Sequence, residues 1–467
     1  MSFVTPVFPL FLLAVLLLIR HIPAGKRWMA LLPASLLFYA WGNAWLLVLL
    51  LAVVLVSYGC ALEMKAAAPA SRRILLVLGC GSCLALLFIF KYLDLAASGV
   101  CLALRLFGRE LRFDGFGLLL PMGISFYTFQ AMAYMIDVYR GEVTAEQHLG
   151  RYALFVSFFP QLVAGPIERS RDLLPQLAAP VDPDADMRAD GVRLLLRGFA
   201  KKVMVADCIS GFVDTAYRAP AAAGGVAMVL ATALFAVQIY CDFSGYTDIA
   251  RGCALLAGVR LQENFLRPYA AVTVRDFWHR WHVSLTRWFT DYVYIPLGGN
   301  RRGLARQCVN VLLVFLVSGL WHGADLTFVI WGGLHGLFLV GETLLDRGGE
   351  PKHARLRRCV TLLLVGFAWI FFRADSVQNA AGILQTIVLA PKPEQWLAGL
   401  GMTWPQLPMV LGLLALLSLL ERLPVLRPGR HAPGIVLTYF LLIAGIVCCR
   451  LLTLHQGGAA AFIYFQF

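Results

Sequence analysis

Long apolar runs alternate with short polar segments along nearly the whole chain. The apolar runs include 7–19, 44–61, 75–90, 225–239, 309–320, 360–372, 409–420 and 435–447. These runs are continuous and do not alternate with a period of two, so they predict membrane helices and not the strands of a membrane barrel. We expect an all-α polytopic membrane protein with about ten to thirteen transmembrane helices.

The composition supports this prediction. Of 467 residues, 60% are hydrophobic and 14% are charged, and the mean hydropathy is +0.73, whereas a typical soluble domain carries about 25% charged residues. Few polar stretches are long enough to fold independently, which excludes a soluble enzyme, a single-span receptor and a disordered scaffold. We therefore expect one membrane domain over residues 1–467.

The net charge of +13 comes from basic residues that cluster between the apolar runs. This is the distribution expected when positive residues stay on the cytoplasmic side of a membrane, and we expect no nucleic-acid partner. The eleven cysteines are mostly single, in or beside apolar runs, and we interpret them as small apolar residues.

Two central segments depart from the pattern of simple spans. Residues 168–190 contain three prolines and four closely spaced aspartates, which predicts an irregular loop before a basic amphipathic helix over 193–202. Residues 267–306 are too polar to span lipid and too aromatic to be a solvated loop. We expect an interfacial helix, with tryptophan and arginine among lipid headgroups, or a re-entrant segment lining a polar cavity, and the two interpretations are not exclusive.

Histidine is scarce, and four of the nine lie between His279 and His335. His282 closes the sequence WHRWH, and His322 follows an apolar run directly. An ionisable group at the end of a span is costly unless it faces a cavity or a partner, so both are candidate functional residues. His335 is more consistent with a structural role.

Three kinds of chemistry are candidates for these histidines. His279 and His282 are spaced to share a helix face, but no HExxH motif occurs and no nearby carboxylate has a ligand-like spacing to them, which argues against a metal site. Ser244 does not lie in the GxSxG motif of a serine nucleophile. General-base catalysis needs the least additional structure, because a neutral imidazole can take a proton from a hydroxyl that attacks a thioester.

Several motifs in the same order closely resemble the membrane-bound O-acyltransferase (MBOAT) superfamily, in its bacterial branch typified by the alginate O-acetyltransferase membrane subunit. They are RDFWHRWHVSLTRWFTDY at 275–292, YIPLGGNR at 294–301, QIYCDFSGYTD at 238–248, PMGISFYTFQ at 121–130 and QLVAGP at 161–166. The resemblance implies a ring of tilted helices around a central funnel. It also implies that His322 is similar to the essential histidine of the superfamily, with His282 as the second polar position.

The resemblance further implies an O-acetyltransferase of the bacterial inner membrane. It would take acetyl from cytoplasmic acetyl-CoA, use no metal, and serve an exported polysaccharide such as alginate or cellulose. The expected partners are a periplasmic acetyltransferase of the SGNH type or another acceptor protein, the polysaccharide synthesis and export complex, and membrane lipids. Arg301, Arg302 and Arg306 are candidates for binding the phosphates of coenzyme A, although a topogenic role explains them more simply.

Two other functions remain open. The same fold could transfer D-alanine from a carrier protein to teichoic acid, or the protein could be a transporter whose histidines relay protons. The aromatic tail 457–467 also has two interpretations. It is either a membrane-interface anchor, or a segment whose Tyr464 accepts the acyl group and hands it to the periplasmic partner.

Overall fold

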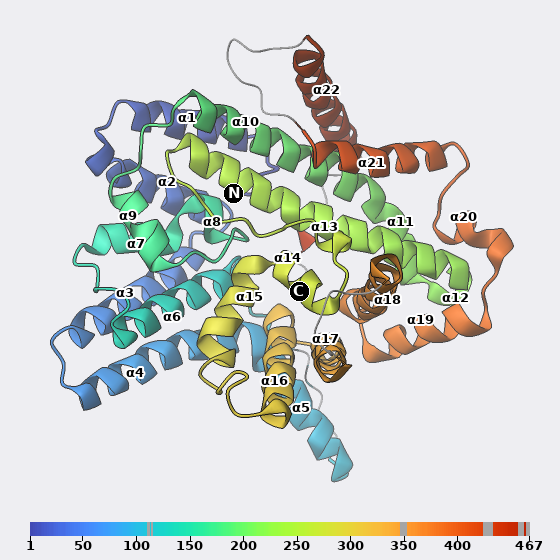
Figure 1. Ribbon diagram of the computed structural model, residues 1–467, viewed down its shortest axis with the longest axis horizontal. Helices are drawn as coiled ribbons and strands as arrows, with labels where there is room; N and C mark the ends of the chain where they lie inside the picture. The colour runs from blue at the N-terminus through green and yellow to red at the C-terminus, as the bar shows by residue number, and fades with distance from the viewer. Residues whose placement is uncertain (110–112, 114, 346–352, 424–432, 456–461, 464–467) are drawn as a thin grey trace. The chain divides into compact units, whose positions relative to one another are not determined.

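A computed structural model describes residues 1–109, 113, 115–345, 353–423, 433–455 and 462–463 of the chain (Figure 1). The described residues are predominantly helical and include no strand, which confirms the prediction of an all-α protein. They fall into two compact units. Unit 1 contains residues 1–191 and 253–262, and unit 2 contains residues 192–252 and 263–467.

Unit 1 is built from the first helices of the chain. Its complete helices are α1 (Phe8–Arg20), α2 (Trp28–Ala40), α3 (Leu46–Met64), α4 (Pro69–Leu87), α5 (Leu93–Leu106), α6 (Ile124–Arg140), α7 (Leu149–Ser157), α8 (Phe159–Leu162) and α9 (Ser170–Ala178). Helix α6 is buried along almost its whole length, and α3 and α4 pack against it. At Gly79 of α4, an added Cβ would lie 2.5 Å from the sulfur of Met135 and 3.2 Å from that of Cys60. Glycine therefore lets these three helices approach closely.

Unit 2 holds most of the remaining helices. They are α11 (Asp207–Arg218), α12 (Pro220–Ala223), α14 (Val274–Arg280), α15 (Val283–Phe289), α16 (Leu304–His322), α17 (Leu326–Leu345), α18 (Ala354–Arg373), α19 (Val377–Leu389), α20 (Trp396–Gly399), α21 (Gln406–Leu420) and α22 (Pro433–His455). Two helices, α10 (Ala185–Phe199) and α13 (Gly225–Leu256), have residues in both units. Residues Ala200–Ala206 continue α10 as a π-helix.

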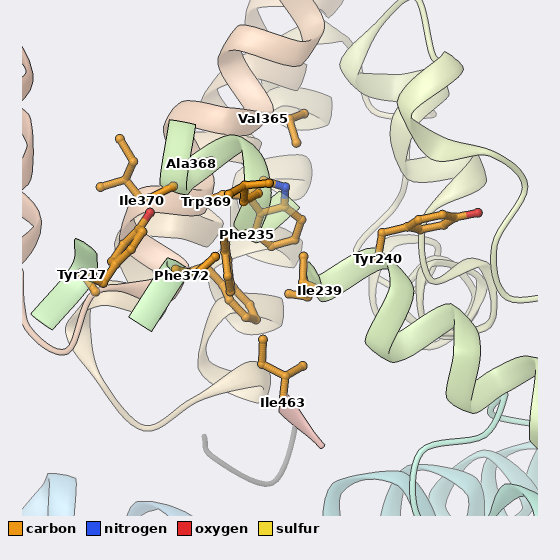
Figure 2. Close-up of a cluster of buried hydrophobic side chains, with 14 of the residues drawn as sticks. Tyr217, Phe235, Ile239, Tyr240, Val365, Ala368, Trp369, Ile370, Phe372 and Ile463 are labelled. Atoms are coloured by element: carbon orange, nitrogen blue, oxygen red, sulfur yellow. The ribbon is translucent and has the colours of Figure 1, made fainter. Parts of the chain in front are cut away.

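An aromatic cluster forms the core of unit 2 (Figure 2). Trp369 lies at its centre, with its ring 5.2 Å from Trp281 and 6.1 Å from both Trp331 and Phe235. These rings come from α13, α14, α17 and α18 or the residues directly after them, so the cluster joins segments that are far apart in the sequence. Large buried rings contribute much of the packing energy of such a core.

Helices α16 and α17 lie in backbone contact. A Cβ added at Gly319 would lie 2.3 Å from the carbonyl oxygen of Phe328, and one added at Gly332 would lie 2.2 Å from that of Phe315. Small residues permit this close approach between helices in membranes. The contact fixes the end of α16, where His322 lies.

The apolar runs of the sequence correspond to helices. Five described helical stretches are long and apolar enough to cross a membrane: Leu46–Met64, Pro69–Arg105, Gly225–Leu256, Leu304–His322 and Leu326–Leu345. Five shorter apolar helices accompany them: Phe8–Arg20, Trp28–Ala40, Val377–Leu389, Gln406–Leu420 and Val436–Leu451. Segment 267–306 forms only short helices before α16 begins, and its interfacial or re-entrant position stays a prediction.

The prediction of an irregular loop over 168–190 was wrong in two places. Ser170–Ala178 forms α9 with Pro175 inside it, and α10 begins at Ala185, before the expected position 193. One of the aspartates that suggested a loop caps this helix, because the backbone N–H of Met187 donates to Asp184 Oδ1 at 2.7 Å. Aspartate is favoured both at helix N-caps and in turns, so its presence alone does not distinguish a helix start from a loop.

Gly332→Ala tests the contact between α16 and α17. The added methyl group has no room against the Phe315 carbonyl, so we expect a loss of about 1–3 kcal/mol in stability, measured as a lower unfolding temperature in detergent. Gly341→Ala in the same helix is the control, because no atom lies within 4 Å of its added Cβ. Equal unfolding temperatures for the two variants would contradict the close packing.

Candidate active site

His322 is the last residue of α16 and is almost completely buried. Its Nδ1 lies 2.7 Å from the carbonyl oxygen of Ser318. A carbonyl oxygen can only accept, so Nδ1 carries the hydrogen, and in the neutral ring Nε2 carries the lone pair. The rings of Trp331 and Phe372 lie 4.8 and 5.7 Å from the imidazole and hold it in place.

His282 lies between α14 and α15 in a strained backbone conformation. Its φ of 45° and ψ of 52° are left-handed values that histidine rarely adopts, and the side chain is fully buried. Asn264 holds it there, because Asn264 O accepts from the N–H of Val283 at 3.0 Å and Asn264 Oδ1 lies 3.2 Å from His282 Nδ1. Strain of this kind persists only where the surroundings enforce it, and it is common at functional sites.

The hydrogen bonds of Asn264 also define the state of His282. The backbone N–H and the hydroxyl of Ser284 approach Asn264 Oδ1 at 3.1 and 2.9 Å. A backbone N–H can only donate, so this amide atom is the oxygen, and His282 Nδ1 must donate to it. Like His322, the neutral His282 ring therefore carries its lone pair on Nε2.

The structure brings the two candidate histidines together. The ring of His282 lies 6.0 Å from that of Trp321, which directly precedes His322. Burial, followed by the charge of nearby His322, lowers the pKa of His282 well below its ordinary value. A neutral imidazole with a lone pair on Nε2 is the form that accepts a proton or a hydrogen bond.

His335 lies in the adjacent aromatic core. It is fully buried, and Trp278 Nε1 donates to its Nδ1 at 3.2 Å. The ring of Trp331 lies between the two histidines, 5.1 Å from His335 and 4.8 Å from His322. His335 therefore has the opposite tautomer to His322, with the hydrogen on Nε2, which suits a packing role better than that of a base.

Two pockets of unit 2 are lined by residues that hydrogen-bond to the candidate histidines. The first, which we call the apolar pocket, has a volume of about 290 Å³ and lies among α14 to α17. Ser318 lines it, and the Ser318 carbonyl is the group that orients His322. Neither His282 nor His322 lines the pocket itself.

The second, which we call the charged pocket, has a volume of about 260 Å³. Its charged lining consists of Arg197, Lys201, Asp248, Arg251, Glu263, Arg267 and Glu421. Lys201 Nζ lies 3.1 Å from Asp248 and 2.7 Å from Glu421. Arg197 donates to both carboxylate oxygens of Asp248, at 2.5 and 2.9 Å. Asn264 also lines this pocket, so the pocket is one side chain away from His282.

The three candidate arginines lie outside both pockets. Arg301, Arg302 and Arg306 are exposed and line neither pocket, and their role in binding phosphates stays a prediction. Among the described residues, no group of three or more histidine, cysteine, aspartate or glutamate side chains is arranged to hold a metal ion.

Tyr464 lies outside the described residues, but the two described residues nearest to it in the sequence are docked in unit 2. The N–H of Ile463 donates to Asp242 Oδ2 at 2.6 Å, and Ile463 is buried in the aromatic core (Figure 2). The ring of Phe462 lies 5.9 Å from Phe243, whose own ring lies 4.8 Å from His282. One phenylalanine thus separates the docked segment from the candidate site.

Neither Asn264 nor the buried ion pairs of the charged pocket were predicted from the sequence. Asn264 lies in a short polar stretch after α13, where asparagine usually marks a turn. A signal for the ion pairs was present, because Asp242, Ser244, Thr247 and Asp248 occur within a mainly apolar helix. Such polar groups must be paired or functional when they are buried.

His282→Asn tests the buried neutral histidine through the pH dependence of stability. Burial lowers the pKa of His282 in the folded protein. The contribution of the neutral ring to the free energy of unfolding is therefore complete above about pH 6.5, the pKa of histidine in an unfolded chain. This contribution is lost as the pH falls from there toward the pKa of the folded state. We expect the unfolding temperature in detergent to fall below pH 6.5 less steeply in the variant than in the parent. Asparagine tolerates the left-handed backbone, and equal slopes would contradict the assignment.

Comparison with known proteins identifies the family. Residues 146–379 match the model of the membrane-bound O-acyltransferase family. The chain is 39% identical over 379 residues to a probable alginate O-acetylase, AlgI, of Pseudomonas putida (80% of this chain, 77% of the relative). It is 34% identical over 394 residues to a peptidoglycan O-acetyltransferase of Helicobacter pylori (78% and 73%). A teichoic acid D-alanyltransferase of Bacillus subtilis is 28% identical over 260 residues (54% and 66%). The chain belongs to the membrane-bound O-acyltransferase family and is a multi-pass membrane O-acyltransferase.

Proposed function

We propose that this O-acyltransferase takes acetyl from cytoplasmic acetyl-CoA and passes it across the bacterial inner membrane to an exported polysaccharide such as alginate or cellulose. The observation that carries the proposal is the pair of buried histidines, each oriented through Nδ1 by a defined acceptor. The names of the alginate and peptidoglycan acetylating relatives support acetyl as the group transferred. The final transfer to the sugar belongs to a periplasmic partner enzyme.

In the proposed reaction His322 is the general base. Its Nε2 takes the proton from the acceptor hydroxyl while the hydroxyl oxygen bonds to the carbonyl carbon of the thioester. The carbon–sulfur bond then breaks, and the proton passes from His322 to the departing thiolate. Base catalysis of this kind contributes about 10²–10⁴-fold to the rate. The lone pair on His282 Nε2 suits a group that orients the acceptor hydroxyl, and less well one that stabilises negative charge.

The proposal includes the aromatic tail as an acyl carrier. Acetyl must reach the periplasm without being lost to water, and a tyrosine ester offers a covalent intermediate. Support comes from the docking of Phe462 and Ile463, since Phe462 packs on Phe243 beside His282. In this scheme the Tyr464 hydroxyl is the first acceptor, and a serine of the periplasmic partner is the second.

Two rival functions are distinguished by the donor. An enzyme that uses D-alanyl carrier protein, as the name of the teichoic acid relative suggests, would not bind acetyl-CoA. A transporter would bind substrate but leave the thioester intact. Release of free coenzyme A by the purified protein in proteoliposomes supports the proposed acetyltransferase against both.

His322→Ala should abolish release of coenzyme A and acetyl transfer in proteoliposomes, with a loss of at least about 10²-fold. His322→Asn is a sharper variant, because its amide nitrogen can still donate to Ser318 while the base is removed. The control is His335→Asn, whose amide oxygen can still accept from Trp278 and which should retain transfer per folded molecule. Transfer at the parental rate by either His322 variant would contradict the general-base role.

Tyr464→Phe removes one hydroxyl and keeps the ring, so an anchor would tolerate the change and an acyl carrier would not. We expect loss of polymer acetylation in cells, and an acetylated tail peptide in the parent protein by mass spectrometry. Tyr58→Phe, which removes a hydroxyl bonded to the Gln147 carbonyl in unit 1, should leave acetylation unchanged. Full acetylation by Tyr464→Phe together with an unmodified parent tail would exclude the carrier role.

A further inference from the structure

Four buried polar atoms converge on the charged pocket without a hydrogen-bond partner among the described residues. They are Ser244 Oγ, Thr247 Oγ1, Arg251 Nε and Asn264 Nδ2. Buried polar groups are normally satisfied in native proteins, so several exceptions around one pocket point to a ligand that satisfies them. Asn264 is only 1% exposed, and its amide nitrogen is therefore not satisfied by bulk water.

The free amide nitrogen of Asn264 follows from what its oxygen does. Oδ1 accepts from His282 Nδ1 and from both the N–H and the hydroxyl of Ser284. These bonds fill the acceptor capacity of Oδ1. The remaining atom of the amide group is therefore the nitrogen, Nδ2. Asn264 lines the charged pocket, and it thus has an oxygen bonded to His282 and an amide donor without a partner.

The proposed reaction requires such a donor. As the thioester carbonyl carbon is attacked, its oxygen becomes negative and must be stabilised by hydrogen-bond donors. His282 and His322 each donate through Nδ1 to a protein acceptor, so their neutral rings have no N–H left on Nε2 to offer. A separate donor beside the histidines has to supply this hydrogen bond.

Among the described residues the other unsatisfied donors fit less well. Trp331 Nε1 is buried and without a partner near His322, but it lies in the apolar core and lines neither pocket. The hydroxyls of Ser244 and Thr247 line the charged pocket, but no hydrogen bond links them to either histidine. Within the described part of the chain, Asn264 alone combines an unsatisfied donor, a place in a pocket and a direct bond to a candidate catalytic residue.

We infer that Asn264 is a further catalytic residue, whose Nδ2–H₂ donates to the carbonyl oxygen of the acyl thioester while its Oδ1 orients His282. The inference rests on the proposed function, and it adds the hydrogen-bond donor that stabilises negative charge on the thioester oxygen. Attack by the acceptor oxygen moves the carbonyl π electrons onto oxygen, where Asn264 stabilises them. Their return expels the thiolate, which takes the proton from His322. No further reactant is needed.

The test compares two inert ligands in one protein. Acetonyl-CoA carries a ketone, and S-propyl-CoA has the same chain length without one. The purified full chain should bind acetonyl-CoA about three- to tenfold more tightly, as one extra hydrogen bond predicts. Asn264→Asp keeps an oxygen for His282 and Ser284 but loses the amide donor, so the preference should fall to about one and kcat should fall about 10²–10³-fold.

Two variants serve as controls. Asn310→Asp alters another buried asparagine of unit 2, whose Nδ2 donates to the Gly299 carbonyl at 2.9 Å, and should keep the ligand preference. Trp331→Phe removes the other buried donor near His322 and should also keep the preference for acetonyl-CoA. The inference is overturned if the preference survives in Asn264→Asp or disappears in Trp331→Phe.

A measurement on the parent protein avoids any question of folding. The infrared carbonyl band of bound ¹³C-labelled acetonyl-CoA should move to lower frequency than in water if a buried donor contacts it, and an unshifted band would overturn the inference. Equal binding of the two ligands by the parent would also overturn it. If the parent binds neither ligand, the use of acetyl-CoA is wrong, which is a separate failure.

Discussion

The cost of burying polar groups among apolar helices governs this molecule. Helix α13 carries Asp242 and Asp248 within a mainly apolar sequence, and both are buried. Each is paired with a lysine of the segment after α10: Lys202 lies 2.6 Å from Asp242, and Lys201 lies 3.1 Å from Asp248. Removing one partner of a buried ion pair typically costs about 3–5 kcal/mol. The ion pairs thus hold α13 to its neighbour and keep polar groups available beside the candidate site.

The same constraint explains how the candidate histidines are held. Each is buried, and each has one nitrogen satisfied by a specific acceptor, Ser318 O for His322 and Asn264 Oδ1 for His282. Aromatic rings fill the space around them, so neither ring can turn without losing both packing and a hydrogen bond. The close contact between α16 and α17 fixes the end of α16, where His322 lies. A rigid arrangement of this kind is what acyl transfer needs to align donor and acceptor.

The sequence predicted the helices well and the site only in part. Apolar runs are a strong signal because lipid requires the backbone to satisfy its own hydrogen bonds, and the eight runs correspond to helices. His282 and His322 were identified because ionisable residues are rare beside such runs. Asn264 was missed because its role depends on the left-handed backbone of His282 and on Ser284, a three-dimensional arrangement without a local pattern. The aspartates at 182–190 led to the wrong prediction of a loop, because aspartate is favoured both in turns and at helix N-caps.

The π-helix at Ala200–Ala206 has a consequence for the evolution of the chain. It allows consecutive lysines to serve different ion pairs, Lys201 with Asp248 and Glu421, and Lys202 with Asp207 and Asp242. A π-helix holds more residues per turn than an α-helix. Deleting one residue of this segment would restore α-helical geometry there and change the directions in which Lys201 and Lys202 project. The ion pairs that depend on these directions would then be disturbed together. Insertions and deletions should therefore be rarer here among homologous genes than substitutions, and rarer than in the turn before α10.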